Sequence, residues 1–201
     1  DRAVLEYPQV KAGIILMMDR EFTVKQNEII VDKAIKYQSQ GIVGIDVAGP
    51  NRKTFSVQEH KYLFDRARKA GLGLTIHTGE EAQLDEMRYV VNEIKPDRIG
   101  HGIQCVHDKE LMKAVVKNNI TLEICPTSNL RNSVIKNVPE LKSAIRTLLK
   151  NKIKFAICTD GPEMYQTSIM IEHEFLLKNK ILTQKELDQT THWAMKASFI
   201  K

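Results

Sequence analysis

Leu74-Thr75-Ile76-His77-Thr78-Gly79-Glu80 is an apolar, β-branched run that ends in a histidine, with a carboxylate three residues further on. Two later stretches share this design, because Arg98–Gly102 ends in a histidine and a glycine, and Phe155–Pro162 carries Asp160 just before Gly161. In each, a short strand is predicted to present an ionisable residue at its C-terminal end and to break at glycine. If these ends lie side by side, two histidines and two carboxylates face one pocket.

Six apolar runs alternate with amphipathic stretches along the chain. Strands are predicted at about residues 11–18, 41–50, 74–77, 98–101, 121–124 and 154–159, and helices at about 24–40, 57–70, 81–94, 108–118, 139–150, 167–179 and 183–198. The segment 125–129 is predicted to lead into a polar loop. Near-continuous apolar strands, starting with a first strand buried on both faces, are typical of a parallel sheet that helices cover.

Two architectures fit this alternation: a doubly wound, flavodoxin-like sheet and a TIM-type (β/α)8 barrel. Ionisable residues follow several different strands, as they do in barrel enzymes, and in a linear sheet these strand ends would not all converge. The sequence therefore predicts an α/β fold of the TIM-barrel type, with one catalytic domain over residues 1–201. Six strand–helix units are two fewer than a closed barrel needs.

Composition restricts the possible partners and the compartment. The 201 residues carry a formal net charge of +5 that is spread along the chain, with no basic run of the kind that binds nucleic acid. No apolar stretch reaches the ~20 residues that span a membrane, and no signal peptide is recognisable. Three cysteines without a CxxC motif indicate reduced thiols. We therefore expect a cytoplasmic protein with neither nucleic-acid nor membrane partners.

The residues at the strand ends suit metal chemistry. His77 and His101 offer neutral imidazoles and Asp160 offers a hard oxygen, a combination that zinc accepts. Glu80 stands where a general acid or base that is not itself a ligand would lie. A metal lowers the pKa of its bound water from about 15.7 to about 7, so the pattern predicts metal-assisted hydrolysis.

Each of these residues also has a structural interpretation when it is taken alone. A histidine at a strand end is often only hydrogen-bonded, Asp160 can be a turn residue, and Glu80 can be a carboxylate that the helix dipole favours in a first turn. Their coincidence at successive strand ends favours a site. The remaining histidines are interpreted as surface or packing residues, and they are His60, His107, His173 and His192. Cys125 and Cys158 lie inside or at the end of predicted buried strands without a partner for activation, so neither is expected to be a nucleophile. No glycine-rich nucleotide-binding loop occurs.

Five ordered motifs resemble those of the adenosine deaminase family of metal-dependent aminohydrolases, which are (β/α)8 barrels. The resemblance runs from about Lys11 to the C-terminus. The motifs are Gly44-Ile45-Asp46-Val47-Ala48-Gly49, His77-Thr78-Gly79-Glu80, Arg98-Ile99-Gly100-His101-Gly102, Glu123-Ile124-Cys125-Pro126-Thr127-Ser128-Asn129 and Cys158-Thr159-Asp160.

The resemblance implies zinc-dependent deamination of adenosine or a related aminopurine nucleoside to the oxo product and ammonia, with one zinc ion per complete chain. His77 and Asp160 would be zinc ligands, and Asp160 would also hold the attacking water. Glu80 would protonate the purine ring nitrogen beside the attacked carbon. His101 would help to deprotonate the water and stabilise the developing alkoxide, and the backbone of Gly49 would contact the ring's far nitrogen.

The chain departs from the family pattern in two places. The family's His-x-His pair, which supplies two zinc ligands at the first barrel strand, is absent. We therefore expect strands three to eight of a larger enzyme, and an isolated stretch that is inactive. Gly161 stands where the family has a second aspartate that contacts the purine. A different amino-heterocycle or a nucleotide as substrate, or a non-catalytic binding module, are the alternatives.

Overall fold

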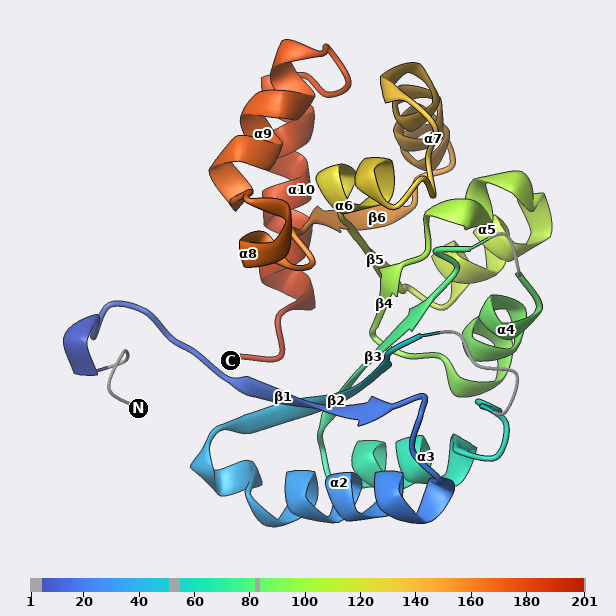
Figure 1. Cartoon of the computed structure of the whole chain (residues 1–201), viewed down its shortest axis with the longest axis vertical. Coiled ribbons are helices and arrows are strands. Elements are labelled where there is room, and N and C mark those ends of the chain that lie inside the picture. The colour runs from blue at the N-terminus through green and yellow to red at the C-terminus, as the bar shows by residue number, and fades with distance from the viewer. Residues whose placement is uncertain (1–4, 51–54, 82–83, 201) are drawn as a thin grey trace. The chain divides into compact units, whose positions relative to one another are not determined.

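The structure is a computed structural model that describes residues 5–50, 55–81 and 84–200 (Figure 1). Within these residues, six strands follow one another in chain order, and the pairs between β1 and β2, β2 and β3, β4 and β5, and β5 and β6 are parallel. The strands are β1 (Ile14–Asp19), β2 (Ile42–Ala48), β3 (Gly73–Thr78), β4 (Arg98–His101), β5 (Thr121–Ile124) and β6 (Lys154–Ile157). The predicted parallel α/β arrangement is confirmed.

The chain forms two compact units. One extends to Ile76 and includes the C-terminal residues from Ser198, and the other spans His77–Ala197. The strand β3 passes from the first unit into the second between Ile76 and His77. A single catalytic domain over residues 1–201 stays a prediction.

In the first unit, α2 (Val24–Lys36), the short turn η1 (Gln38–Gln40) and α3 (Lys61–Lys69) accompany the strands (Figure 1). Apolar residues at helical spacing bury one face of each helix, and they include Val31, Ala34, Leu63, Phe64 and Ala67. The predicted helix over residues 57–70 starts later, at Lys61. Residues 57–60 form a turn in which the ring of His60 contacts the carbonyl oxygen of Ser56.

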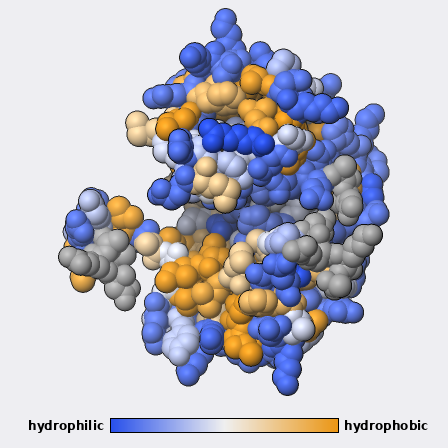
Figure 2. Space-filling view, in the orientation of Figure 1, coloured by the Kyte–Doolittle hydropathy of each residue, from blue (hydrophilic) through white to orange (hydrophobic). Residues whose placement is uncertain are grey.

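The strand β1 is exposed on one side, which corrects the prediction that it is buried on both faces. Ile14 and Met17 are 55% and 46% exposed. Figure 2 shows hydrophobic residues at the surface over this strand. Among the described residues β1 lies at the end of the strand order and pairs only with β2, so part of its apolar side chains has no covering layer.

In the second unit, helices accompany β4, β5 and β6, and α10 (Gln184–Ala197) packs against β6, with a T-shaped contact between Phe155 and Trp193. The predicted capping box of Thr183 and Glu186 is present before this helix. The helical elements are α4 (Leu84–Tyr89), η2 (Val90–Ile94), η3 (Ile103–His107), α5 (Lys109–Lys117), α6 (Pro126–Arg131), α7 (Val138–Lys150), α8 (Pro162–Tyr165), α9 (Ile169–Lys178) and α10 (Gln184–Ala197).

Helical segments of the second unit also differ from the sequence-based prediction. The segment 125–129, predicted from sequence to lead into a polar loop, instead begins the short helix α6 at Pro126, where a proline is pre-organised for a first turn. A second short helix, α8, follows Gly161. The predicted helix over 81–94 ends in the wider π-helical turn η2, and its residues 82–83 lie outside the described residues. In the described part of the chain, no helix combines the length and the apolarity that crossing a membrane requires.

Candidate metal centre and active site

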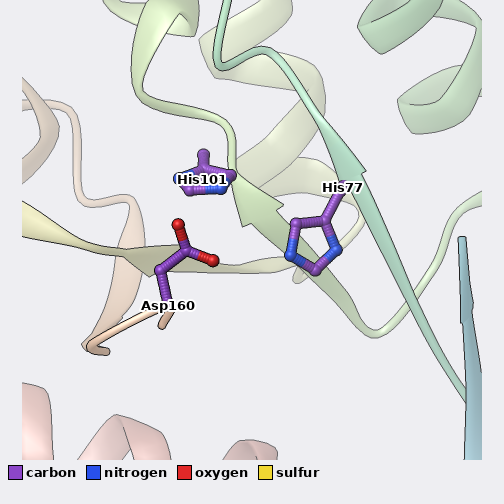
Figure 3. Close-up of side chains that lie close together, drawn as sticks. All are labelled: His77, His101 and Asp160. Atoms are coloured by element: carbon purple, nitrogen blue, oxygen red, sulfur yellow. The ribbon is translucent and has the colours of Figure 1, made fainter. Parts of the chain in front are cut away.

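Three residues from three strand ends lie together in the second unit. His77 belongs to the end of β3, His101 is the last residue of β4, and Asp160 follows β6. One potential ligand atom from each residue lies within 4.8 Å of those of the other two. Figure 3 shows the three side chains pointing toward one another. The structure therefore brings together three of the residues that the sequence analysis selected.

The absence of a side chain at Gly100 makes room for the ring of His77. A Cβ atom added at Gly100 would lie 2.7 Å from Cγ of His77, closer than real Cβ contacts. The rings of His77 and His101 meet edge to face, with centroids 5.4 Å apart. A glycine one residue before His101 therefore allows β3 and β4 to present both imidazoles at one place.

His101 is buried, with 3% of its surface exposed, and its backbone has the left-handed conformation at φ 60°. Its Nδ1 lies 3.2 Å from the side-chain Nδ2 of Asn129, and its Nε2 lies 3.7 Å from a carboxylate oxygen of Glu80. Burial lowers the pKa of His101 and the neighbouring His77 lowers it further, while Glu80 and Asp160 act in the opposite direction. The lowered pKa favours the neutral imidazole, the form that binds metals and accepts protons.

Asp160 is held from the side of α6. The hydroxyl of Ser128 donates a hydrogen bond of 2.7 Å to Oδ2 of Asp160, and Ser128 itself is fully buried. Asp160 also has a left-handed backbone, at φ 62°, a conformation that is costly for a residue other than glycine and that clusters at functional sites. One carboxylate oxygen is thus fixed by a protein donor.

Glu80 follows β3 and is 33% exposed on its side chain. It reaches the cluster through His101, so the fourth predicted residue of the second unit also lies at this place. Gly49 belongs to the first unit, where it follows β2 with φ 107°, a conformation that favours glycine. Its contact with a substrate stays a prediction.

His77, His101 and Asp160 face a cavity of about 330 Å³. The other residues that line it are Gly100, Glu123, Cys125, Cys158, Thr159 and Ile169. Burial raises the pKa of the Cys158 thiol to about 12 and raises that of Cys125 further. Neither thiol is ionised near neutral pH, so neither is an activated nucleophile.

The backbone conformation at Gly161 does not require a glycine, because its φ is −111°. A Cβ atom there would lie 3.3 Å from Cβ of Met164, so a larger residue needs only a small shift of its neighbour. The difference from the family pattern at this position is therefore a difference in side-chain chemistry.

Sequence reasoning assigned no role to Ser128 and Asn129, although both lie in one of the quoted motifs. Both are fully buried on α6 and contact Asp160 and His101. Their burial identifies them, since buried polar groups need a partner, and the sequence alone does not show that burial.

The chemistry of the donor set fits zinc. Two imidazoles and one carboxylate with converging donor atoms are ligands that zinc accepts, and the lowered pKa of His101 keeps that imidazole available. His77 and Asp160 would hold the ion together with ligands from elsewhere, and the geometry also allows His101 to approach it.

The fold and the site together define an α/β protein whose parallel strands end at a candidate metal centre. The chain belongs to the adenosine deaminase family, whose family model matches residues 3–201. An adenine deaminase of Rhizobium rhizogenes is 30% identical over 199 residues, which cover 99% of this chain and 61% of that protein. The chain spans between 43% and 61% of the lengths of the curated relatives that it matches.

Solved structures confirm the class of fold. The N6-mAMP deaminase of Arabidopsis superimposes with a TM-score of 0.82 at 25% identity, over 94% of this chain and 55% of that one. A zinc-bound amidohydrolase of Burkholderia ambifaria gives a TM-score of 0.84 at 20% identity, over 100% of this chain and 55% of that one, a likeness of fold alone. The six strands thus represent part of a TIM-type barrel, as predicted.

Proposed function

We propose that this chain forms the greater part of the active site of a zinc-dependent hydrolase. The enzyme would remove the amino group of adenosine or a related aminopurine nucleoside and release the oxo product and ammonia. The observation that carries this proposal is the convergence of His77, His101 and Asp160, with Glu80 beside His101. Membership of the family supports the type of reaction.

Each residue has a distinct role in the proposed reaction. His77 and Asp160 would hold a zinc ion, which when bound would supply Lewis-acid chemistry and a lowered pKa of water, about 7. His101, as a neutral imidazole, accepts a proton from the attacking water and stabilises the alkoxide that forms. Glu80 donates a proton to the ring nitrogen next to the amino-bearing carbon, which relieves the negative charge that the attack creates. The C–N bond then breaks as protonated His101 returns its proton to the amino group, which leaves as ammonia. The hydroxyl group loses its remaining proton to Glu80 and becomes the oxo group, so both residues regain their starting states.

The two zinc ligands that this chain lacks would come from outside the 201 residues, so we propose that activity belongs to a longer protein. His77 and Asp160 alone are an incomplete set for zinc, which is usually four-coordinate or keeps three protein ligands. The isolated stretch should therefore bind zinc weakly and turn over no substrate. We also propose that the complete enzyme acts on small molecules in the cytoplasm as one catalytic domain.

The substrate is further defined by Gly161. Without a carboxylate at this position, the imidazole side of a purine loses one hydrogen-bonding partner, and either Glu163 or a water molecule takes its place or the substrate differs there. The printed names of similar proteins include deaminases of adenine and of N6-mAMP. These names support a panel of nucleosides, free bases and nucleotides as candidate substrates.

Ammonia release from such a panel of aminopurines tests the proposal in the complete protein. Glu80→Gln should leave zinc content unchanged and lower turnover by about 10²–10⁴-fold, because proton donation is lost. Glu81→Gln, at the exposed neighbouring position, is the matched control and should behave as wild type. Absence of turnover for every compound would refute the deaminase proposal, and an active Glu80→Gln variant would refute the role of Glu80.

A non-catalytic binding module is the second candidate, because half of the family's ligand set lies outside this chain. Metal analysis of the complete protein separates the two functions. The enzyme requires roughly one zinc ion per chain, since a single catalytic metal serves one site. A complete protein without zinc favours the binding module.

A further inference from the structure

Glu172 is a fully buried carboxylate on α9 that the proposed reaction does not use. One of its oxygens accepts a hydrogen bond of 3.1 Å from the backbone N–H of Thr127, and the other accepts one of 2.6 Å from the hydroxyl of Thr167. Acidic side chains are almost never fully buried unless they are paired. Both oxygens of Glu172 are therefore committed to particular partners in the protein.

The partner N–H belongs to the first turn of α6, which is the element that contacts the site. The residues after Thr127 are Ser128, which donates to Asp160, and Asn129, which contacts His101. The first N–H groups of a helix have no partner within the helix and need an acceptor from elsewhere. A helix of six residues is also too short to be stable by itself, so its placement depends on contacts such as this one.

We propose that Glu172 is a positioning residue that fixes the first turn of α6, and through Ser128 and Asn129 the orientation of Asp160 and His101. The inference rests on the proposed function, because it assigns these two residues to the reacting site. Glu172 touches neither of them and acts only through α6. Thr167, which lies just before α9, holds the second oxygen and fixes the carboxylate plane.

A glutamine at position 172 should preserve the positioning role of the glutamate. Its amide oxygen can accept from the N–H of Thr127, and its amide nitrogen can donate to the hydroxyl of Thr167, which serves as donor or acceptor. A leucine of similar size can make neither bond. Hydrogen-bonded positioning thus predicts that Glu172→Gln is active and that Glu172→Leu is impaired, whereas a role of the negative charge predicts that both are impaired.

The experiment compares Glu172→Gln, Glu172→Leu and the exposed control Glu174→Leu in the complete, zinc-loaded protein. Glu172→Leu should lower kcat, and the affinity for zinc in a chelator competition, by about 10–100-fold, as supporting residues of metal sites do, with KM changed by less than about threefold. Glu172→Gln and Glu174→Leu should stay close to wild type. A Glu172→Leu variant with wild-type kcat and zinc affinity overturns the proposal, and so does a Glu172→Gln variant as impaired as Glu172→Leu.

Two further measurements keep the proposal testable. If Glu172→Leu does not fold, Thr167→Val removes only the bond to the second oxygen and should lower kcat by roughly threefold, less than Glu172→Leu does. NMR signals of the Asn129 side-chain amide and the His101 ring require no turnover. They should shift in Glu172→Leu and Thr167→Val but not in Glu172→Gln, and unchanged signals in all variants overturn the inference. If wild type deaminates none of the panel, the proposed function fails, while zinc affinity and these signals still decide the role of Glu172.

Discussion

Two buried histidines, His60 in the first unit and His101 in the second, each contact the side-chain amide of an asparagine. Nε2 of His60 lies 3.0 Å from Nδ2 of Asn27, and Nδ1 of His101 lies 3.2 Å from Nδ2 of Asn129. The difference lies in the other ring nitrogen. Nδ1 of His60 contacts the backbone oxygen of Ser56 at 2.8 Å, whereas Nε2 of His101 faces the carboxylate of Glu80.

This comparison separates a structural histidine from a candidate catalytic one. Both ring nitrogens of His60 have a hydrogen-bond partner, and the ring stacks on Phe55. The side-chain amide of Asn27 also accepts from the backbone N–H of Asp19 and donates to its carbonyl oxygen. A ring with both nitrogens committed has one fixed tautomer and no atom available for a substrate. In His101, by contrast, Nε2 is directed at the carboxylate of Glu80, so this histidine is a candidate for proton transfer although it also contacts an asparagine.

The largest effect should follow the removal of the imidazole with the available nitrogen. We expect His101→Gln to lower the turnover of the complete enzyme by about 10²–10⁴-fold, because a positioned proton acceptor is lost. Steady-state kinetics on the preferred aminopurine, with zinc content measured in parallel, tests this. Turnover close to wild type would mean that the contrast with His60 has no catalytic meaning.

A second effect should follow a change beside the other ring of the cluster. Gly100→Ala places a Cβ atom against the ring of His77, which must then move. We expect zinc affinity to fall by about 10–100-fold, as happens when the support of a metal ligand is lost. Competition with a chelator measures this. Gly41→Ala, where a Cβ would meet nothing within 4 Å and the cost is that of a left-handed backbone, is a control for a glycine replacement away from the ring of His77. Equal zinc affinities in the two variants would contradict the steric argument.

The strand ends could be predicted from sequence because their signals are local. A β-branched run that breaks at Gly79, Gly102 or Gly161 predicts both the strand and the residue that its end presents. The helix α6 could not be predicted in this way, because Thr127, Ser128 and Asn129 favour turns when only local sequence is considered. Its helical form is supported by Glu172, which lies 45 residues away along the chain.

The exposed side of β1 could not be predicted from local sequence either. A run such as residues 14–18 indicates an apolar strand, but hydrophobic periodicity does not reveal how many layers cover it. The contact between Ser128 and Asp160 joins residues 32 positions apart and follows from the order of β5 and β6, not from any local pattern. Residue types at the site were thus predictable, and the residues that hold them in place were not.

The third prediction concerns the structural histidine. His60→Leu should lower the free energy of unfolding by about 2 kcal/mol, because the buried amide of Asn27 loses an acceptor and the carbonyl of Ser56 loses its donor. Turnover per folded molecule should not change. Urea unfolding together with kinetics at a temperature where both proteins are folded measures the two quantities. Loss of turnover without loss of stability would reverse the assignment of the two histidines.

The smallest effect concerns the asparagine beside the candidate catalytic ring of His101. Oδ1 of Asn129 has no hydrogen-bond partner among the residues that the structure describes, whereas the polar atoms of Asn27 are all used. With the amide turned by half a rotation, Oδ1 accepts a hydrogen bond from Nδ1–H of His101 and leaves Nε2 with the lone pair that a proton acceptor needs.

We therefore expect Asn129→Leu to lower kcat by about tenfold through the loss of one preferred tautomer, an effect near the lower limit for lost support of a site. Asn129→Asp, which can only accept from Nδ1–H when ionised, should retain more activity than Asn129→Leu. The ¹⁵N chemical shifts of the His101 ring report the tautomer directly and should show Nδ1–H in wild type and in Asn129→Asp. A wild-type ring protonated at Nε2 instead would show that Asn129 donates to His101, as Asn27 does to His60, and the two pairs would then be held in the same way.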